Sequence, residues 1–278
     1  MTFSNSFDQR LNGAVRAEFD RALSHQSNLW KIQVLLAGAA IASVFWPSTS
    51  NAAALIGLLL LAVYAWQKTI YEEVKARANQ GRRAVLVSSS LGGLTPDQRR
   101  DLLSRFSSTS EEGEAREDPA YYASSATEQN KRLAEMLEES AFWTADLHGQ
   151  AARRSWSILI IFLAIALTSL LLLPFISAGP ALNIARTISA MLVLLMSGEM
   201  LGTALSFSSA QKCSEKVVER LQRIKAEGSP ISSLIIVFAD YNAAVEAAPI
   251  VPGRLYEKRK PELNRLWSEH SDGSKQQS

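Results

Sequence analysis

Two groups of aromatic, basic and amide side chains in this 278-residue chain have the types that nucleotide recognition requires. Aromatic rings can stack on a base, an arginine fork fits a phosphate, and an amide can pair with the edge of a base. One group precedes an apolar stretch in mid-chain, and the other follows the last apolar stretch. The residues are Tyr121, Tyr122, Arg132 and Trp143 in the first group, and Asp240, Tyr241, Asn242, Asn264, Arg265 and Trp267 in the second.

The same residues also fit a second interpretation, an amphipathic core with tyrosine hydroxyls at its rim, and composition alone favours that interpretation. Catalytic and metal-binding patterns are missing from the sequence. His25, His148 and His270 lie in different segments, and the single cysteine, Cys213, can form neither an intrachain disulfide nor a zinc site. We therefore expect no enzymatic activity, no metal and no cofactor.

Four apolar stretches dominate the organisation of the chain, and they form two pairs with short loops. A bilayer core about 30 Å thick needs about 20 apolar residues in helical form. The last two stretches reach that length, and the second can continue past Trp66 with Lys68 snorkelling. The sequence predicts an all-α integral membrane protein with four transmembrane helices as two hairpins. The stretches are Leu29–Trp46, Ala52–Trp66, Trp156–Ile176 and Ile184–Phe207.

The distribution of positive charge predicts the topology. Of the 29 Lys and Arg residues, none lies in the loops Pro47–Asn51 and Ser177–Asn183, whereas thirteen lie between Gln67 and Arg154 and eleven after Phe207. Because positive residues stay on the cytoplasmic side, both loops should face outward and both termini the cytoplasm. We therefore expect a multi-pass protein of the cell inner membrane with a mostly helical cytoplasmic domain.

The expected segments follow from these stretches. Neither cytoplasmic segment has the basic excess that binding to a DNA or RNA polymer requires, because thirteen basic residues accompany fourteen acidic ones in 67–154. The division is 1–28 as a cytoplasmic amphipathic helix, 29–71 as the first hairpin, 72–155 as a cytoplasmic segment, 156–207 as the second hairpin, 208–270 as a cytoplasmic helical segment and 271–278 as a disordered tail.

Local signals suggest further detail in the cytoplasmic segments. Val85–Val87 could be a short strand or a buried turn. Thr95, followed by Pro96 and Gln98, is typical of a helix start. The segment Ser107–Glu117 has few apolar residues and is expected to be a mobile loop. Pro261–His270 is expected to be a short final helix.

Glu199 is the one acidic residue inside a predicted span, and such a carboxylate usually faces protein or water. It could line a pore or bind a proton, or it could pair with Lys31 or Gln33 at a similar depth. Gly198 and Gly202 follow the small-xxx-small pattern that lets helices approach closely. That contact could lie within one chain or between copies.

Several motifs resemble the SMODS-associated four-transmembrane effectors of bacterial anti-phage systems. The resemblance covers the order of the spans and about 60 cytoplasmic residues. It rests on Asp118-Pro119-Ala120-Tyr121-Tyr122, Arg132-Leu133-Ala134-Glu135, Glu139-Ser140-Ala141-Phe142-Trp143-Thr144, Ala239-Asp240-Tyr241-Asn242-Ala243-Ala244 and Leu263-Asn264-Arg265-Leu266-Trp267.

This resemblance implies a function. A cyclic nucleotide or oligonucleotide messenger would bind the cytoplasmic domain, copies of the chain would associate into a homo-oligomer, and the spans would permeabilise the membrane and arrest growth. Two alternatives remain open from the sequence. The chain could be a constitutive small ion channel, or a membrane anchor or scaffold that senses no nucleotide.

Overall fold

A computed structural model of the chain describes residues 3–46, 48, 50–118, 121–175, 179, 183–185, 187–188 and 199–275. Side chains are not described for residues 3–8, 50, 173, 199 and 272–275. Over these residues the chain is helical and contains no strand, as expected for an all-α protein. The helices are α1 (Phe3–Phe45), α2 (Ser50–Leu91), α3 (Pro96–Ser104), α4 (Ser110–Glu114), α5 (Gln129–Leu172), the 3-10 turn η2 (Leu173–Phe175), α7 (Glu199–Ala226), α8 (Ile231–Ala247) and α9 (Gly253–Lys275).

Three of these helices, α1, α2 and α5, are long and apolar enough to cross a bilayer. The 44 residues of α5 extend about 66 Å at about 1.5 Å per residue, roughly twice the thickness of a hydrocarbon core. Only the apolar part of α5, from Trp156 onward, therefore needs to lie in lipid. Much of the fourth expected span, Ile184–Phe207, lies outside the described residues.

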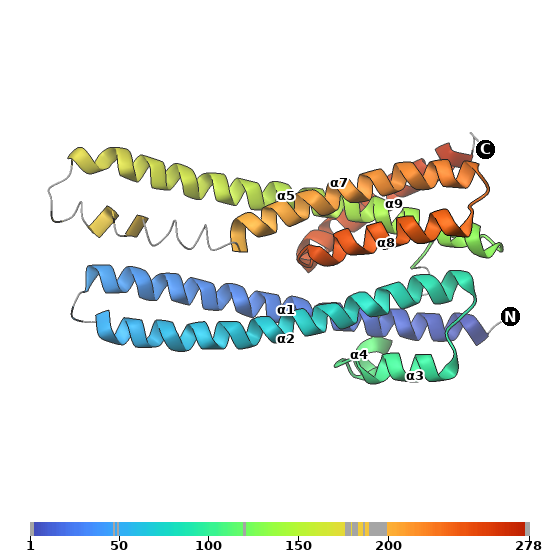
Figure 1. The fold of residues 1–278 in the computed structure, drawn as a ribbon, viewed down its shortest axis with the longest axis horizontal. Helices are drawn as coiled ribbons and strands as arrows, with labels where there is room; N and C mark the ends of the chain where they lie inside the picture. The colour runs from blue at the N-terminus through green and yellow to red at the C-terminus, as the bar shows by residue number, and fades with distance from the viewer. Residues whose placement is uncertain are drawn as a thin grey trace. The chain divides into compact units, whose positions relative to one another are not determined.

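The chain divides into two compact units, and the helices in each are drawn in Figure 1. The first unit comprises Met1–Leu23, Glu73–Ala151 and Ser206–Ser278. The second comprises Ser24–Glu72 and Ala152–Leu205. We describe each unit separately.

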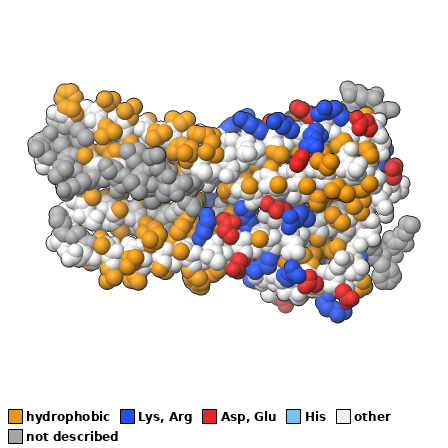
Figure 2. All heavy atoms as spheres, in the orientation of Figure 1, with side chains coloured by type: hydrophobic (Ala, Val, Ile, Leu, Met, Phe, Trp, Pro, Cys, Tyr) orange, Lys and Arg blue, Asp and Glu red, His pale blue; other side chains and the backbone are white. Residues whose placement is uncertain are grey.

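The second unit exposes large apolar side chains along its helices. Leu58, Trp66 and Leu171 are each more than 60% exposed, and hydrophobic side chains cover much of the visible face of this unit in Figure 2. Its polar side chains bond within or between helices, as Gln33 Nε2 does in donating to the Tyr64 hydroxyl at 3.2 Å. An apolar surface of this extent favours contact with lipid or with another protein over contact with water.

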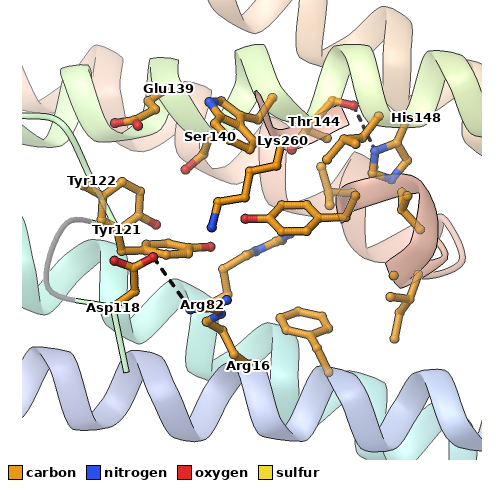
Figure 3. Close-up of a pocket in the computed structure, with 18 of the residues that line it drawn as sticks. Arg16, Arg82, Asp118, Tyr121, Tyr122, Glu139, Ser140, Thr144, His148 and Lys260 are labelled. Carbon is orange, nitrogen blue, oxygen red and sulfur yellow. Dashed lines mark hydrogen bonds and ion pairs between the residues drawn. The ribbon is translucent and has the colours of Figure 1, made fainter. Parts of the chain in front are cut away.

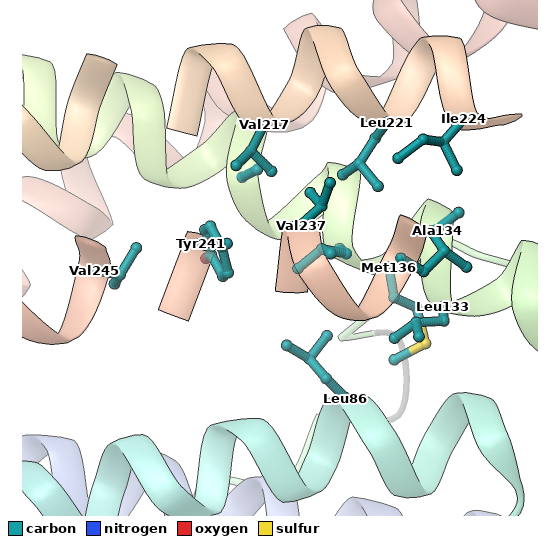
Figure 4. Close-up of a cluster of buried hydrophobic side chains, with 13 residues drawn as sticks. Leu86, Leu133, Ala134, Met136, Val217, Leu221, Ile224, Val237, Tyr241 and Val245 are labelled. Carbon is teal, nitrogen blue, oxygen red and sulfur yellow. The ribbon is translucent and has the colours of Figure 1, made fainter. Parts of the chain in front are cut away.

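The main core of the first unit lies between α5, α7 and α8, with one residue from α2 (Figure 4). Leu133 and Leu137 of α5 are spaced by four, as are Val217 and Leu221 of α7, so each pair lies on one face of its helix. Leu86 of α2 is fully buried against them. In the first unit, this core packs against the N-terminal half of α5.

A second, smaller core joins α1, α2 and α3. It contains Leu11, Val15, Val85 and Leu102. Val85 and Leu86 are adjacent in α2 yet belong to different cores, because successive helical residues point about 100° apart. The expectation of a strand or turn at Val85–Val87 is therefore wrong. Burial on two sides of the helix overrides the preference of the valines for strands.

Glu18 of α1 joins three segments of the first unit and is fully buried. Its carboxylate accepts hydrogen bonds from Arg77 Nε at 3.0 Å and from the backbone N–H groups of Ser107 at 3.0 Å and Ser108 at 3.1 Å. These bonds offset the cost of burying a charge, which would otherwise be several kcal/mol. They also fix the segment that follows α3.

That segment was expected to be a mobile loop, and the structure corrects the expectation in part. It contains α4, whose N-cap Thr109 accepts from the backbone N–H of Glu112 while the Glu112 side chain accepts from Thr109, a reciprocal capping box. Arg21 of α1 also bonds the Glu112 carboxylate at 2.9 Å. These contacts explain the order of a stretch that has few apolar residues.

Helix ends in the first unit follow the local chemistry. The expected start at Thr95 is confirmed, because Thr95 and Gln98 form a capping box ahead of Pro96. After α7, Gly228 has φ +85°, a left-handed conformation that glycine adopts without strain. The final helix was expected at Pro261–His270, but α9 is longer at both ends, contains Pro261 in its interior and includes part of the expected tail.

Candidate ligand-binding site

The first unit contains an open cavity of about 590 Å³, a volume typical of small-molecule sites. Side chains reach it from α1, α2, the segment before α5, α5 itself, α8 and α9, as the close-up in Figure 3 shows. Segments far apart in the sequence thus contribute to a single site.

Aromatic side chains form much of the wall. The rings of Tyr121 and Tyr122 pack edge to face with centroids 4.8 Å apart, and Trp143 of α5 lies 6.0 Å from Tyr256 of α9. The aromatic lining residues are Phe19, Tyr121, Tyr122, Trp143, Tyr241, Tyr256 and Trp267.

Arg82 of α2 supplies a fixed guanidinium to the cavity. Its Nη2 donates to Asn242 Oδ1 at 3.1 Å, and its guanidinium lies 5.5 Å from the centroid of the Tyr241 ring. Its Nε is buried and has no hydrogen-bond partner among the described residues. This nitrogen is covered by protein atoms, so it serves to define the guanidinium position and does not itself face the cavity.

Three further donors in the wall lack a partner within the described part of the chain. The indole N–H groups of Trp143 and Trp267 are buried without a hydrogen bond. Lys260 of α9 extends its ammonium into the cavity toward Tyr121 and Arg82 (Figure 3), and no described group pairs with it. Of these groups the Lys260 ammonium faces the cavity, and a cation there suits a ligand with acceptor oxygens.

Helix α9 is held in place by contacts on both sides of Lys260. Arg259 donates two hydrogen bonds to the Asp146 carboxylate, at 2.9 and 2.7 Å. Nearer the C-terminal end, His270 lies 3.2 Å from the buried Glu138, which also binds Lys225 of α7 at 2.5 Å. These ion pairs fix the helix and hence the place of the Lys260 side chain.

The cavity also contains carboxylates. Arg16 pairs with Asp118 at 3.8 Å, and Arg116 pairs with Asp20 at 2.7 Å. Glu139 differs because its contact is the backbone N–H of Ala123, which donates at 2.9 Å. Burial raises the pKa of Glu139 to about 7, although this hydrogen bond lowers it.

His148 of α5 completes the wall as a neutral ring. Burial lowers the pKa of His148 to about 4, and its Nδ1 lies 3.0 Å from the Thr144 carbonyl oxygen, which orients the imidazole. The Thr144 hydroxyl lies 2.9 Å from the Tyr241 hydroxyl. This part of the wall is therefore ordered and uncharged.

The cavity brings together five of the eight ligand-binding residues expected from the sequence, Tyr121, Tyr122, Trp143, Tyr241 and Asn264. The other three do not line it. Asn242 lies behind Arg82 and orients it. Arg132 is not part of the wall, and Arg265 is on the surface, where it pairs with Glu262 at 2.7 Å and Glu269 at 2.6 Å.

The basic residues of the wall, Arg82 and Lys260 among them, were not predicted as ligand-binding residues from the sequence. Their spacing offered a signal, because Lys75, Asn79 and Arg82 recur at intervals of four and three on one face of α2. Lys260 and Asn264 share a face of α9 in the same way, but the helix expected from the sequence began after Lys260. The strand or buried turn expected at Val85–Val87 likewise hid the continuity of α2, which ends at Leu91.

The intramembrane residues singled out from the sequence remain predictions. Glu199 begins α7, but its side chain lies outside the described residues, as does Gly198. Lys31 is exposed and donates to Asn28 Oδ1 of its own helix at 3.2 Å. No described atom lies within 4 Å of a Cβ built on Gly202.

Comparison with known proteins adds no relative: no family model, no curated protein and no solved structure matches the chain.

Proposed function

We propose that this chain is a membrane effector whose first unit senses an anionic, ring-containing small molecule of the nucleotide class. The observation that carries the proposal is the cavity, in which the Lys260 ammonium and the Arg82 guanidinium lie among aromatic rings. A nucleotide has both parts that such a wall would bind: phosphate oxygens for the donors and a flat base for the rings.

The apolar helices support the membrane half of the proposal. α1, α2 and α5 are long and apolar enough to cross a bilayer, and each contributes residues to both units. The charge asymmetry of the loops favours a cytoplasmic position for the cavity, where a messenger would be available. In this proposal, the bound messenger leads to permeabilisation of the cell inner membrane and to growth arrest, the outcome that the resemblance to anti-phage effectors implies.

Reconstitution tests the proposal directly. The protein in detergent is mixed with a panel of mononucleotides and cyclic di- and trinucleotides, and thermal stability is measured. The same protein in liposomes that contain a quenched dye is then given the ligand that raises the melting temperature. We expect a shift, and dye release only with that ligand.

Each other outcome points to one alternative. Dye release without any nucleotide would favour a constitutive channel. Neither a thermal shift nor dye release, at any concentration in the panel, would favour an anchor or scaffold and would end the sensor proposal.

A further inference from the structure

Helix α8 is apolar on two faces. One face, with Leu234, Val237 and Tyr241, is buried in the main core of the first unit. The opposite face is open, where Ile235 and Ile236 are each 57% exposed and Ile231 is 39% exposed. A helix that is apolar all round is normally buried, so a partner is missing from this face.

This exposure is concentrated on one element. Among the described residues of the first unit, five large hydrophobic side chains are exposed, and three of them are the isoleucines of α8; the other two are Leu103 and Tyr121. The open face continues along α8 as Ala239, Ala243 and Ala247, all exposed. Ile231, Ile235 and these three alanines are spaced by four and form one ridge of the kind that packs between helices.

We propose that this ridge, hereafter the α8 ridge, is the contact surface between two copies of the chain. The charged side chains beside the ridge favour a second copy of the chain over a partner whose surface carries a single sign of charge. On one flank Arg220 pairs with Asp240, and on the other Arg83 pairs with Glu246 at 3.3 Å. Each flank thus carries both signs on half-exposed side chains, so an identical flank can exchange ion pairs with it and no net charge is brought into contact.

Membrane attachment adds to this preference. A chain held in a bilayer by apolar helices meets its own copies at a high effective concentration. The alanines let two helices approach closely, and the isoleucines supply the apolar area. The ridge is exposed without a ligand, so the association does not depend on the sensing proposed above, and either idea can fail alone.

Cross-linking tests the proposal first. In an isologous pair, the residue at the two-fold axis contacts its own copy, and Ala239 is the midpoint of the ridge. Cys213 is the only cysteine and can be replaced by serine. In that background Ala239→Cys should form disulfide-linked dimers in membranes under mild oxidation. Glu219→Cys, on the exposed charged face of α7, is the matched control and should remain monomeric.

A disruptive change tests it second. Ile235→Asp places a charge on a side chain that touches no core, so the fold should survive, and the mass of the protein in detergent or nanodiscs should fall from dimer to monomer. Leu103→Asp, on α3, makes the same change at the exposed residue outside the ridge and should leave the dimer intact. A monomeric wild-type protein, equal cross-linking of both cysteine variants, or an intact dimer in Ile235→Asp would each overturn the proposal.

Discussion

The Arg82 guanidinium of α2 is held by Asn242 of α8, whose Oδ1 accepts from Nη2 at 3.1 Å. The Asn242 amide is itself fixed, because its Nδ2 donates to the Phe238 carbonyl oxygen at 2.7 Å. Asn242 is 3% exposed and does not line the cavity. In the proposed function it would therefore act on a ligand through Arg82, as a positioning residue.

Asn242→Ala should lower ligand affinity about tenfold and reduce the free energy of unfolding by about 1–3 kcal/mol, because a buried guanidinium loses its acceptor. Titration of the ligand and chemical denaturation measure the two effects. Arg82→Met should produce a similar loss of affinity. If Asn242 acts through Arg82, the double variant should be little worse than either single one, whereas full additivity would mean that the two act separately.

Lys260 and Arg265 lie five residues apart on α9 but should differ in function. Lys260→Ala removes an unpaired ammonium from the cavity and should weaken ligand binding about tenfold or more while leaving stability nearly unchanged. Arg265→Ala removes surface ion pairs and should leave binding intact. Thermal shift with and without ligand compares the two variants. If Arg265→Ala lost binding and Lys260→Ala kept it, the anion site would lie outside the cavity.

This pair of residues also shows where reasoning from sequence failed. Proline normally begins or breaks a helix, so Pro261 was taken as the start of the last helix. In the structure α9 begins at Gly253 and continues through Pro261, which places Lys260 and Tyr256 on the same helix as Asn264. Because the expected helix began about two turns too late, Lys260 lay outside it. Arg265 was therefore expected to bind the ligand in place of Lys260.

Local patterns were more reliable than the arrangement of distant segments. The helix start at Thr95, Pro96 and Gln98 depends on residues a few positions apart, and it is confirmed. The cavity depends on contacts between α1, α2, α5, α8 and α9, separated by up to about 250 residues. No spacing within one helix encodes which helices meet, so aromatic residues could be identified as candidates but not as neighbours.

Glu139→Gln should make the first unit more stable at neutral and alkaline pH. The folded-state pKa of about 7 lies above the unfolded value of 4.5, so the folded state binds its proton more tightly. The stability that this proton provides is present below about pH 4.5 and is lost as pH rises through about 7. The variant carries no such penalty, and its advantage over the wild type should grow across that window, on the order of 3 kcal/mol at most.

The comparison must be made against the wild type at each pH, by chemical denaturation from about pH 4 to pH 8. The lowered pKa of His148, about 4, acts in the opposite direction, because stability is lost as pH falls from about 6.5. Since His148 is present in both proteins, its contribution cancels in the difference. A difference that does not change with pH would show that folding does not raise the pKa of Glu139.

Lys225→Met should strongly destabilise the first unit. Glu138 is 2% exposed, and its carboxylate would keep His270 but lose the Lys225 ammonium at 2.5 Å. Removing one member of a buried ion pair typically costs about 3–5 kcal/mol. Adding Glu138→Leu should restore much of the loss, because the buried charge is then gone. Chemical denaturation of the two single variants and the double variant completes a double-mutant cycle. If the double variant were as unstable as Lys225→Met, the pairing of Lys225 with Glu138 would be refuted.

The placement of Val85 and Leu86 in two cores makes α2 a shared wall of the first unit. If either core unfolds, the other loses its contacts with α2. The unit should therefore unfold in one cooperative transition instead of two. Arg82 precedes these residues by about one turn. A ligand held there would therefore stiffen both halves at once, and amide hydrogen exchange should slow on α3 as well as on α8, although neither helix would need to change its shape.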